Sequence, residues 1–182
     1  MKFKERTLRL KNRKKCTLMP VTPFMAEAMI AYKKRTVRET YYSVFCSDEV
    51  DNDVEIERKI IISRLVNPEK CEMVAIVGGK VVGTCYICPF VDLRKVKHRA
   101  SLSISVLKKY WGLGIANAML EYTIELSREI GFKQIDIEVM DDNYRALSLY
   151  KKHGFVETGY RHNAYLLENG TYHDEILMYK EL

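Results

Sequence analysis

The amino-acid sequence predicts a mixed α/β fold, in which a mainly antiparallel sheet of about six to seven strands carries helices on both faces. Apolar and polar residues alternate in several short segments, such as residues 100–106, and this period of two indicates strands. Apolar residues recur at helical spacing between residues 115 and 130, which indicates an amphipathic helix. Gly78-Gly79 separates two apolar runs and is typical of a tight hairpin turn between antiparallel strands.

The first half of the chain predicts two hairpins and two helices. Thr22-Pro23 is a start signal for a helix, since proline is favoured in the first helical turn. Asn67-Pro68 ends a second helix, because the residue before a proline avoids the helical conformation. The expected elements are strands over residues 7–10 and 16–19, helices over 22–34 and 54–66, strands over 73–77 and 80–88, and a loop over 89–97.

The second half predicts strands that alternate with helices before a final hairpin. Gly131 closes the long helix, and Gly154 ends a shorter one that Asp142 can cap. Asn169-Gly170 is a turn signal between the last two strands. The expected elements are a strand over residues 100–106, a helix over 112–130, a strand over 135–139, a helix over 142–154, and strands over 155–167 and 172–179.

The length of 182 residues fits one domain with a substantial core, so a single domain over residues 1–182 is expected. No apolar run approaches the length that spans a membrane, and the first residues lack the apolar segment of a secretory signal. The five cysteines have no framework spacing, which predicts reduced thiols in a cytoplasmic protein. No membrane partner is expected.

Cys85 and Cys88 form a Cys-x-x-Cys pattern, which in other proteins supplies zinc ligands. Residues three apart in a strand point to opposite faces, and no second pair or nearby histidine completes a ligand set. The pattern therefore predicts two buried structural thiols and no metal.

Eight lysines and arginines lie within the first fifteen residues of a chain whose net charge is +6. Dense basic charge is a footprint of phosphate binding, so a nucleic-acid arm is one interpretation. A charged hairpin at the edge of the sheet is favoured over it, because lysines on an edge strand discourage association between sheets. Residues 7–19 also lack aromatic side chains for base stacking. A nucleic-acid partner is not expected.

The strand over residues 100–106 leads into a basic, glycine-containing turn and then a helix. A helix start offers unpaired N–H groups at the positive end of its dipole, which suits a phosphate or diphosphate. Gly112 and Gly114 let the backbone approach such a ligand, and Lys108 and Lys109 add positive charge. The spacing matches neither a P-loop nor a dinucleotide fingerprint, so another polyanion is expected.

Lys109-x-x-Gly112-x-Gly114 is followed, one helix length later, by Asn-x-x-Ala-x-x-Leu-Tyr-x-Lys-x-Gly-Phe from Asn143 to Phe155. Together, these segments resemble the acetyl-CoA-binding core of the GNAT superfamily of N-acetyltransferases. Its diphosphate loop reads Gln/Arg-x-x-Gly-x-Gly/Ala, so Lys109 is a departure at the first position. The resemblance is specific over residues 100–155 and implies the GNAT fold, acetyl-CoA as cosubstrate and acetyl transfer to an amine.

The resemblance also implies which residues contact acetyl-CoA. In the family, a splayed strand offers main-chain groups to the pantetheine and thioester, and the glycine loop holds the diphosphate. Lys152 matches the helix-end lysine of the family, although a solvated surface charge fits that position equally well. The implied contacts are Ile104, Ser105 and Val106 through their main chain, Lys109, Tyr110, Trp111, Gly112, Leu113 and Gly114 at the diphosphate, Asn143 at the pantetheine, and Lys152.

Acetyl transfer to an amine needs a base for the amine and an acid for the departing thiolate. Tyr150 lies on the same helix face as Asn143, and its hydroxyl is the expected acid. Glu138 stands in a Glu-Val just ahead of that helix, where enzymes that resemble the ribosomal-protein N-terminal acetyltransferases carry their base. An ordinary carboxylate is a weak base for an ammonium group, so Glu138 needs desolvation or a water relay. Glu39 is the competing base.

The sequence defines the acceptor less closely. Glu39 and Tyr41 are the expected acceptor-side residues, and Tyr42, Tyr144 and Tyr160 are further candidates. The C-terminal segment resembles the last strands of ribosomal-protein-like and amino-acid-analogue acetyltransferases. A protein N-terminus and a small primary amine therefore both stay open as acceptors, and a homodimer stays open as well.

No cysteine lies in either motif, which favours direct attack of the amine over an acetyl-cysteine intermediate. A non-catalytic acyl-CoA-binding regulatory module is the alternative function. Gly112, Gly114 and Asn143 fit both functions, whereas Tyr150 and Glu138 favour the enzyme.

Overall fold

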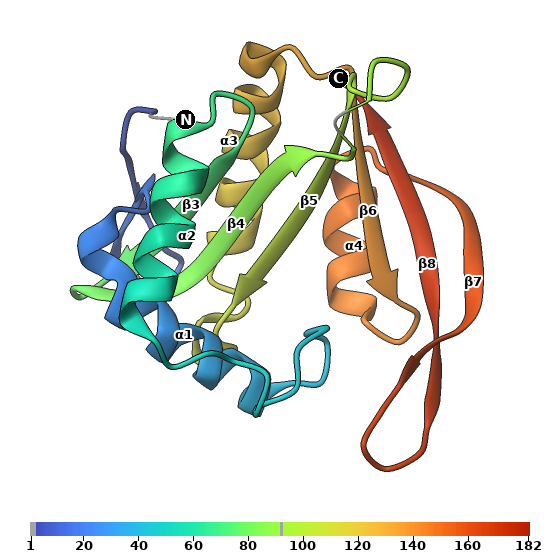
Figure 1. Cartoon of the computed structure of the whole chain (residues 1–182), viewed down its shortest axis with the longest axis horizontal. Coiled ribbons are helices and arrows are strands. Elements are labelled where there is room, and N and C mark those ends of the chain that lie inside the picture. The colour runs from blue at the N-terminus through green and yellow to red at the C-terminus, as the bar shows by residue number, and fades with distance from the viewer. Residues whose placement is uncertain (1–2, 92) are drawn as a thin grey trace.

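The computed structural model describes residues 3–91 and 93–182, and within these ranges eight strands form one sheet (Figure 1). The strand order is β1-β2-β3-β4-β5-β6-β8-β7, and neighbours are antiparallel except for β5 and β6. The count is slightly higher than the six to seven predicted, and it includes the N-terminal hairpin, since β2 pairs with β3 from Thr17 to Pro20. β1 is an edge strand, as expected.

Each predicted strand and helix has a counterpart, and α2 has the predicted bounds. None of the helices in the described ranges is long and apolar enough to cross a membrane. The elements are β1 Arg6–Arg9, β2 Lys15–Pro20, a 3₁₀ turn Pro23–Met25, α1 Ala26–Glu39, α2 Val54–Val66, β3 Cys71–Val77, β4 Lys80–Pro89, β5 Arg99–Val106, a 3₁₀ turn Lys108–Tyr110, α3 Ile115–Ile130, β6 Gln134–Met140, α4 Tyr144–Lys152, β7 Val156–Leu166 and β8 Tyr172–Glu181.

Helices cover both faces of the sheet, with α1 and α2 on one side and α3 and α4 on the other (Figure 1). The alternation along β3 reflects this arrangement. Met73 and Ala75 belong to the core that contains Met119 of α3, whereas Val74 belongs to the core that contains Met29 of α1. The sheet is thus buried between two apolar layers, which fix the helices in place.

α1 is longer than predicted, since it continues from Lys34 to Glu39. No helix breaker lies in the added turn, and Arg35 pairs with Glu39 at 2.7 Å across one turn. The structure therefore adds residues 35–39, for which the sequence predicted no element, to the helix.

α3 and α4 both start later than predicted. Gly112 and Gly114 have φ of 73° and 94°, which a right-handed helix excludes, so α3 begins at Ile115. The cap of α4 is Asn143 rather than Asp142: Ala146 N–H donates to Asn143 Oδ1 at 3.2 Å. The Asp142 carboxylate is used elsewhere, as described below.

All five cysteines are free. Cys85 is buried in the α3-side core, as predicted, but Cys88 is only half-buried. Cys88 lies on the opposite face of β4 close to the end of the strand, where less of the chain covers it. The prediction of two buried thiols is therefore wrong for Cys88.

β5 and β6 pair only where they begin, over Arg99–Ser101 and Gln134–Asp136. β5 then stays on β4 as far as Val106, while β6 stays on β8 as far as Met140. The two strands separate toward their C-terminal ends, as Figure 1 shows. We call the space between residues 102–106 and 137–140 the wedge.

Candidate functional site

The backbone of β5 turns every second residue toward the wedge. Leu107 N–H donates to Val82 O at 2.9 Å, directly across the β4–β5 ladder. Bonded pairs recur every second residue in an antiparallel ladder, so the odd-numbered residues of β5 bond to β4. Ile104 and Val106 therefore direct their N–H and C=O groups into the wedge, where the sequence places main-chain contacts.

Ser105 is oriented differently, because its main chain bonds to β4. Its hydroxyl lies 2.7 Å from that of Tyr32 on α1 and 3.2 Å from Thr84 Oγ1. These contacts hold α1 against the sheet. Ser105 thus supports the wall of the wedge without presenting main-chain groups to it.

The indole of Trp111 closes over the end of β5. Its Nε1 donates to Val106 O at 2.6 Å, and the guanidinium of Arg145 lies 4.6 Å from the centre of its ring. The Val106 carbonyl is therefore occupied, and Val106 N–H is left as a donor facing the wedge. Because Arg145 belongs to α4, this stacked pair also joins the two sides of the wedge.

The turn between β5 and α3 offers a continuous run of free N–H groups. Within the part of the chain that the structure describes, the N–H groups of residues 112–117 donate to no acceptor. They lie at the positive end of the α3 dipole, next to Lys108 and Lys109. The turn is suited to a diphosphate, which is the polyanion that the resemblance implies.

The free N–H groups extend three residues beyond Gly114, where the sequence-based site ended. The last two positions of the family pattern Gln/Arg-x-x-Gly-x-Gly/Ala also match a second register, at Gly114 and Ala116, in which Trp111 departs from the Gln or Arg of the first position. That register reaches into the first turn of α3. The alanine allowed at its last position was the signal for residues 115–117, which sequence reasoning missed.

Tyr150 lies on the inner face of α4 and is 4% exposed. Its ring packs against Phe155 with centroids 5.5 Å apart. Within residues 3–91 and 93–182 its hydroxyl makes no hydrogen bond. It is also not among the fully buried polar atoms that lack a partner, so the hydroxyl is still accessible to solvent. Burial, together with the nearby Cys85 thiol, raises the pKa of Tyr150, so the phenol stays protonated at neutral pH.

Glu138 projects from β6 on the face opposite the buried Ile137 and Val139. Its side chain is 54% exposed, and the nearest cation is Arg161, whose Nη2 lies 3.9 Å away. Arg161 forms its closer ion pair with Glu175, which leaves the Glu138 carboxylate accessible to solvent or a ligand. Tyr150 and Glu138 thus flank the wedge from opposite faces of the sheet.

Glu39, the competing base, is already bound on two sides. Its carboxylate accepts hydrogen bonds from Lys108 N–H at 2.6 Å and from Arg35 Nε at 2.7 Å. Burial by itself would raise the pKa of Glu39, but the hydrogen bonds from Lys108 and Arg35 outweigh it and lower the pKa. A carboxylate in this state is a poor base, and its evident role is to tie the end of α1 to the turn after β5.

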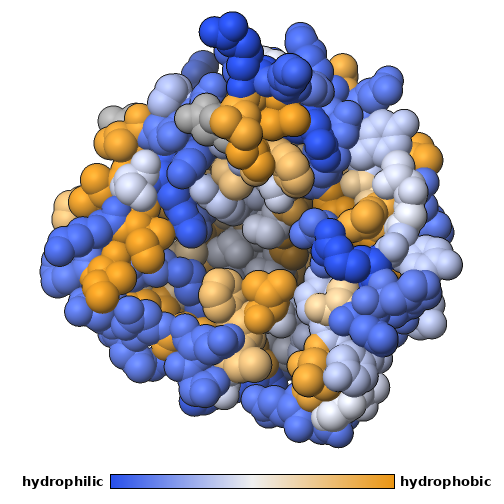
Figure 2. Space-filling model, turned by 45° about the vertical axis from the view of Figure 1, so that its right-hand side comes forward, coloured by the Kyte–Doolittle hydropathy of each residue, from blue (hydrophilic) through white to orange (hydrophobic). Residues whose placement is uncertain are grey.

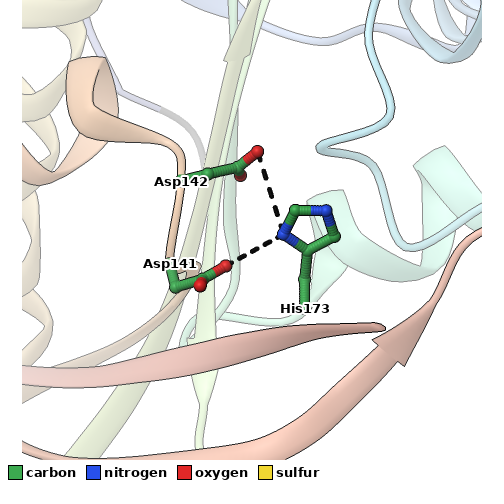
Figure 3. Close-up of side chains that lie close together, drawn as sticks. All are labelled: Asp141, Asp142 and His173. Carbon is green, nitrogen blue, oxygen red and sulfur yellow. Dashed lines mark hydrogen bonds and ion pairs between the residues drawn. The ribbon is translucent and has the colours of Figure 1, made fainter. Parts of the chain in front are cut away.

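Tyr41 closes a cluster of side chains at the end of β6. Its hydroxyl donates to Asp142 Oδ2 at 2.5 Å, and its ring lies 5.7 Å from that of His173. His173 points from β8 toward both carboxylates, with Nδ1 3.0 Å from Asp141 Oδ1 and 3.8 Å from Asp142 Oδ2 (Figure 3). Ligand atoms of these three residues lie within 4.8 Å of one another, but they already bond among themselves, so we assign no metal to them.

The remaining candidates lie around this cluster or at the far end of α4. Tyr42 OH donates to Asp142 O at 3.5 Å, whereas Tyr144 and Tyr160 are exposed. Lys152 Nζ donates to Asn117 Oδ1 at 2.5 Å, so it ties α4 to the first turn of α3. Figure 2 shows a hollow in the face that this view brings forward, with pale side chains deep inside and both hydrophobic and hydrophilic ones on its rim.

A family model described as the acetyltransferase (GNAT) family matches residues 34–155. The matched segment contains both strands of the wedge, the free N–H groups and Tyr150. It thus covers the wedge and the turn before α3, whereas His173 on β8 lies outside the match.

Curated proteins and solved structures are similar over most of the same region. The chain is 33% identical to an N-alpha-acetyltransferase of Sulfurisphaera tokodaii in an alignment 128 residues long, which covers 60% of this chain and 75% of that protein. Other curated relatives, from Rattus norvegicus and Arabidopsis thaliana, are matched over 52% and 51% of their own length.

An acetyltransferase of the GNAT family from Streptococcus pneumoniae has a TM-score of 0.87 at 26% identity, and the match covers 92% of this chain and 99% of that one. A Salmonella typhimurium acetyltransferase, solved with its cofactor acetyl-CoA, has a TM-score of 0.81 over 92% of this chain and 94% of its own. At 17% identity, that second likeness shows the fold alone.

Proposed function

The chain belongs to the acetyltransferase (GNAT) family, and we propose that it transfers the acetyl group of acetyl-CoA to a primary amine by direct attack. One observation carries the proposal. β5 presents the main chain of Ile104 and Val106 to an open wedge. The hydroxyl of Tyr150, which has no hydrogen-bond partner among the described residues, lies on α4 beside it. A donor for the carbonyl and an acid for the sulfur are the groups that thioester aminolysis requires.

The cosubstrate would lie along the turn and the wedge. The N–H groups of residues 112–117 are free to bind its diphosphate, with Lys109 and Tyr110 at the start of the turn. Ile104 offers main-chain groups for the pantetheine. Asn143 offers its amide NH₂ to the same arm, since its Oδ1 caps α4 and its NH₂ donates to none of the described residues. Val106 N–H is the donor we assign to the thioester carbonyl.

Tyr150 and Glu138, on opposite faces of the sheet beside the wedge, are the groups that we assign to the two proton transfers. The amine nitrogen attacks the carbonyl carbon, Val106 N–H stabilises the developing oxyanion, and the carbon–sulfur bond breaks. Tyr150 gives its proton to the departing sulfur, which its raised pKa permits because the phenol is always protonated at neutral pH. Glu138 is our base. Because it is 54% exposed and hydrated, we assign it the removal of the amine proton through a water molecule.

The acceptor would approach from the side of α1 and β8, where Tyr41 and Glu138 lie. The Sulfurisphaera relative is named for N-alpha acetylation, and another relative is named an L-amino acid N-acetyltransferase, from Escherichia coli. Both names describe a primary amine next to a carbonyl group. A protein N-terminus and a small amino compound therefore remain the two acceptor classes.

Release of free thiol from acetyl-CoA, measured with a panel of amines and peptides, tests the proposal. Tyr150→Phe should lower kcat about 100-fold or more, the usual contribution of a general acid. Ser148→Ala is the control, because it removes an exposed hydroxyl from the same helix, and it should keep the parent rate.

Two results would contradict the proposal. If Tyr150→Phe is as fast as the parent at every pH, the acid is another group. If the parent binds acetyl-CoA in a calorimeter but acetylates none of the amines, the chain is an acyl-CoA-binding module.

A further inference from the structure

The N-terminal hairpin runs along α3 toward the proposed diphosphate site. Arg6 of β1 pairs with Glu125, in the middle of α3, at 2.6 Å. Farther along the hairpin, Lys11 N–H donates to Leu113 O at 3.4 Å, just before α3 begins. The turn between β1 and β2 therefore lies against the run of free N–H groups, at the positive end of the helix.

Four exposed cations lie at the end of β1 and in the turn that follows it, and we call them the basic turn: Arg9, Lys11, Arg13 and Lys14. Among the residues with described positions, none of the four forms an ion pair with an acidic side chain, whereas Arg6 on the same hairpin does. The turn is tight, since Arg13 N–H donates to Leu10 O at 2.8 Å. Like charges held this closely repel one another, and an anion would relieve that repulsion.

We propose that the basic turn binds the 3′-phosphate end of the acetyl-CoA nucleotide, an inference that rests on the proposed function. The free N–H groups hold the diphosphate, and the basic turn receives the remaining phosphate of this nucleoside 3′-phosphate 5′-diphosphate. Lys11 lies within one Debye length of the loop, about 8 Å at physiological salt, so its charge acts on a bound phosphate without direct contact. The cluster that suggested a nucleic-acid arm thus acquires a role in cosubstrate binding.

Charge removal in the basic turn, matched by charge removal elsewhere, tests the proposal. Lys11→Gln with Lys14→Gln takes away two cations and leaves Arg13, whose φ is 66°, in place. The control is Arg94→Gln with Lys95→Gln, which removes the same charge at the opposite end of β5. Thermal unfolding establishes that both proteins are folded.

The first variant should raise KM for acetyl-CoA about fivefold at low salt, as expected for two charges near a polyanion, and leave kcat unchanged. The effect should shrink at high salt, be smaller with acetyl-dephospho-CoA, and be absent with acetyl-pantetheine. The control pair should leave KM at the parent value. A lower affinity of the first variant for CoA in a calorimetric titration would support the proposal equally. This measurement needs no turnover, so it tests the basic turn even if the protein acetylates no amine.

An equal rise in KM for acetyl-pantetheine, or an equal rise in the control pair, would overturn the proposal. So would an unchanged affinity for CoA. Loss of binding to an RNA or DNA oligonucleotide, with KM for acetyl-CoA unchanged, would overturn it in favour of a nucleic-acid partner.

Discussion

Replacing Glu39 by glutamine should loosen the turn after β5 without removing the base. Glu39 accepts one hydrogen bond from Lys108 N–H and one from Arg35, and its side chain is 20% exposed. A hydrogen bond to a charged group contributes about 1.5–3 kcal/mol, and an exposed ion pair within a helix about 0.3–0.5 kcal/mol. Glutamine keeps an oxygen that can accept from Lys108 N–H but loses the charge, so the free energy of unfolding should fall by about 1–2 kcal/mol, and Tm by about 2–8 °C.

The pH dependence of this loss follows from the lowered pKa of Glu39. A carboxyl group whose pKa is lower in the folded state stabilises the fold above its unfolded pKa, and this stabilisation disappears as pH falls through the folded pKa. Parent and Glu39→Gln should therefore converge in acid. Denaturant unfolding at several pH values measures the difference between them.

Arg35→Gln is the matched control, because it removes only the exposed ion pair and should cost about 0.5 kcal/mol or less. The pH profile of kcat should keep its shape in Glu39→Gln. A 100-fold loss of kcat at unchanged Tm would refute this reasoning and identify Glu39 as the base.

Three further predictions concern stability and the turn. The free energy of unfolding should fall as pH rises above about 9, because burial raises the pKa of Cys71 and Cys85 to about 12 and the thiols therefore ionise first in the unfolded state. Cys85→Ala should make this fall with pH less steep in denaturant titrations. An unchanged slope would contradict the prediction. Trp111→Phe keeps a ring beside Arg145 but removes the donor to Val106 O, so urea unfolding should show a loss of about 1 kcal/mol, and equal stability would mean that this bond contributes nothing. Gly114→Ala places a side chain at φ of 94°, which should lower the free energy of unfolding by about 1–2 kcal/mol and raise KM for acetyl-CoA severalfold. Gly170→Ala, at φ of 83° in the β7–β8 turn, is the control and should cost similar stability with KM unchanged. An equal rise in KM for Gly170→Ala would argue against a diphosphate site at the turn before α3.

Sequence patterns predicted the elements best where the signals were local. α2 occupies residues 54–66 because Asp53 caps it, accepting from Glu55 N–H at 2.8 Å, and Asn67-Pro68 ends it. The late start of α3 was harder to predict, since a glycine pair is compatible with helix until its positive φ values are known. The length of α1 depends on contacts that no local pattern records.

The motifs located the turn, the wedge strand and Tyr150, but they could not give the direction of each group. Which residues of β5 face the wedge depends on its register with β4, which separates Ser105 from Ile104 and Val106. Glu39 is occupied by a main-chain donor 69 positions away, and Tyr41 bonds to a carboxylate 101 positions away. These contacts arise from tertiary packing, so a single sequence left the choice of base open.

Amide chemical shifts in a ¹⁵N-labelled sample, recorded while CoA is added, test the central claim residue by residue. The free N–H groups of residues 112–117 should shift strongly as they gain acceptors, and Ile104 N–H should shift with the pantetheine, while Ser105 N–H, already bonded to β4, should shift little. Saturating CoA that leaves residues 112–117 unmoved would mean that the turn does not hold the diphosphate.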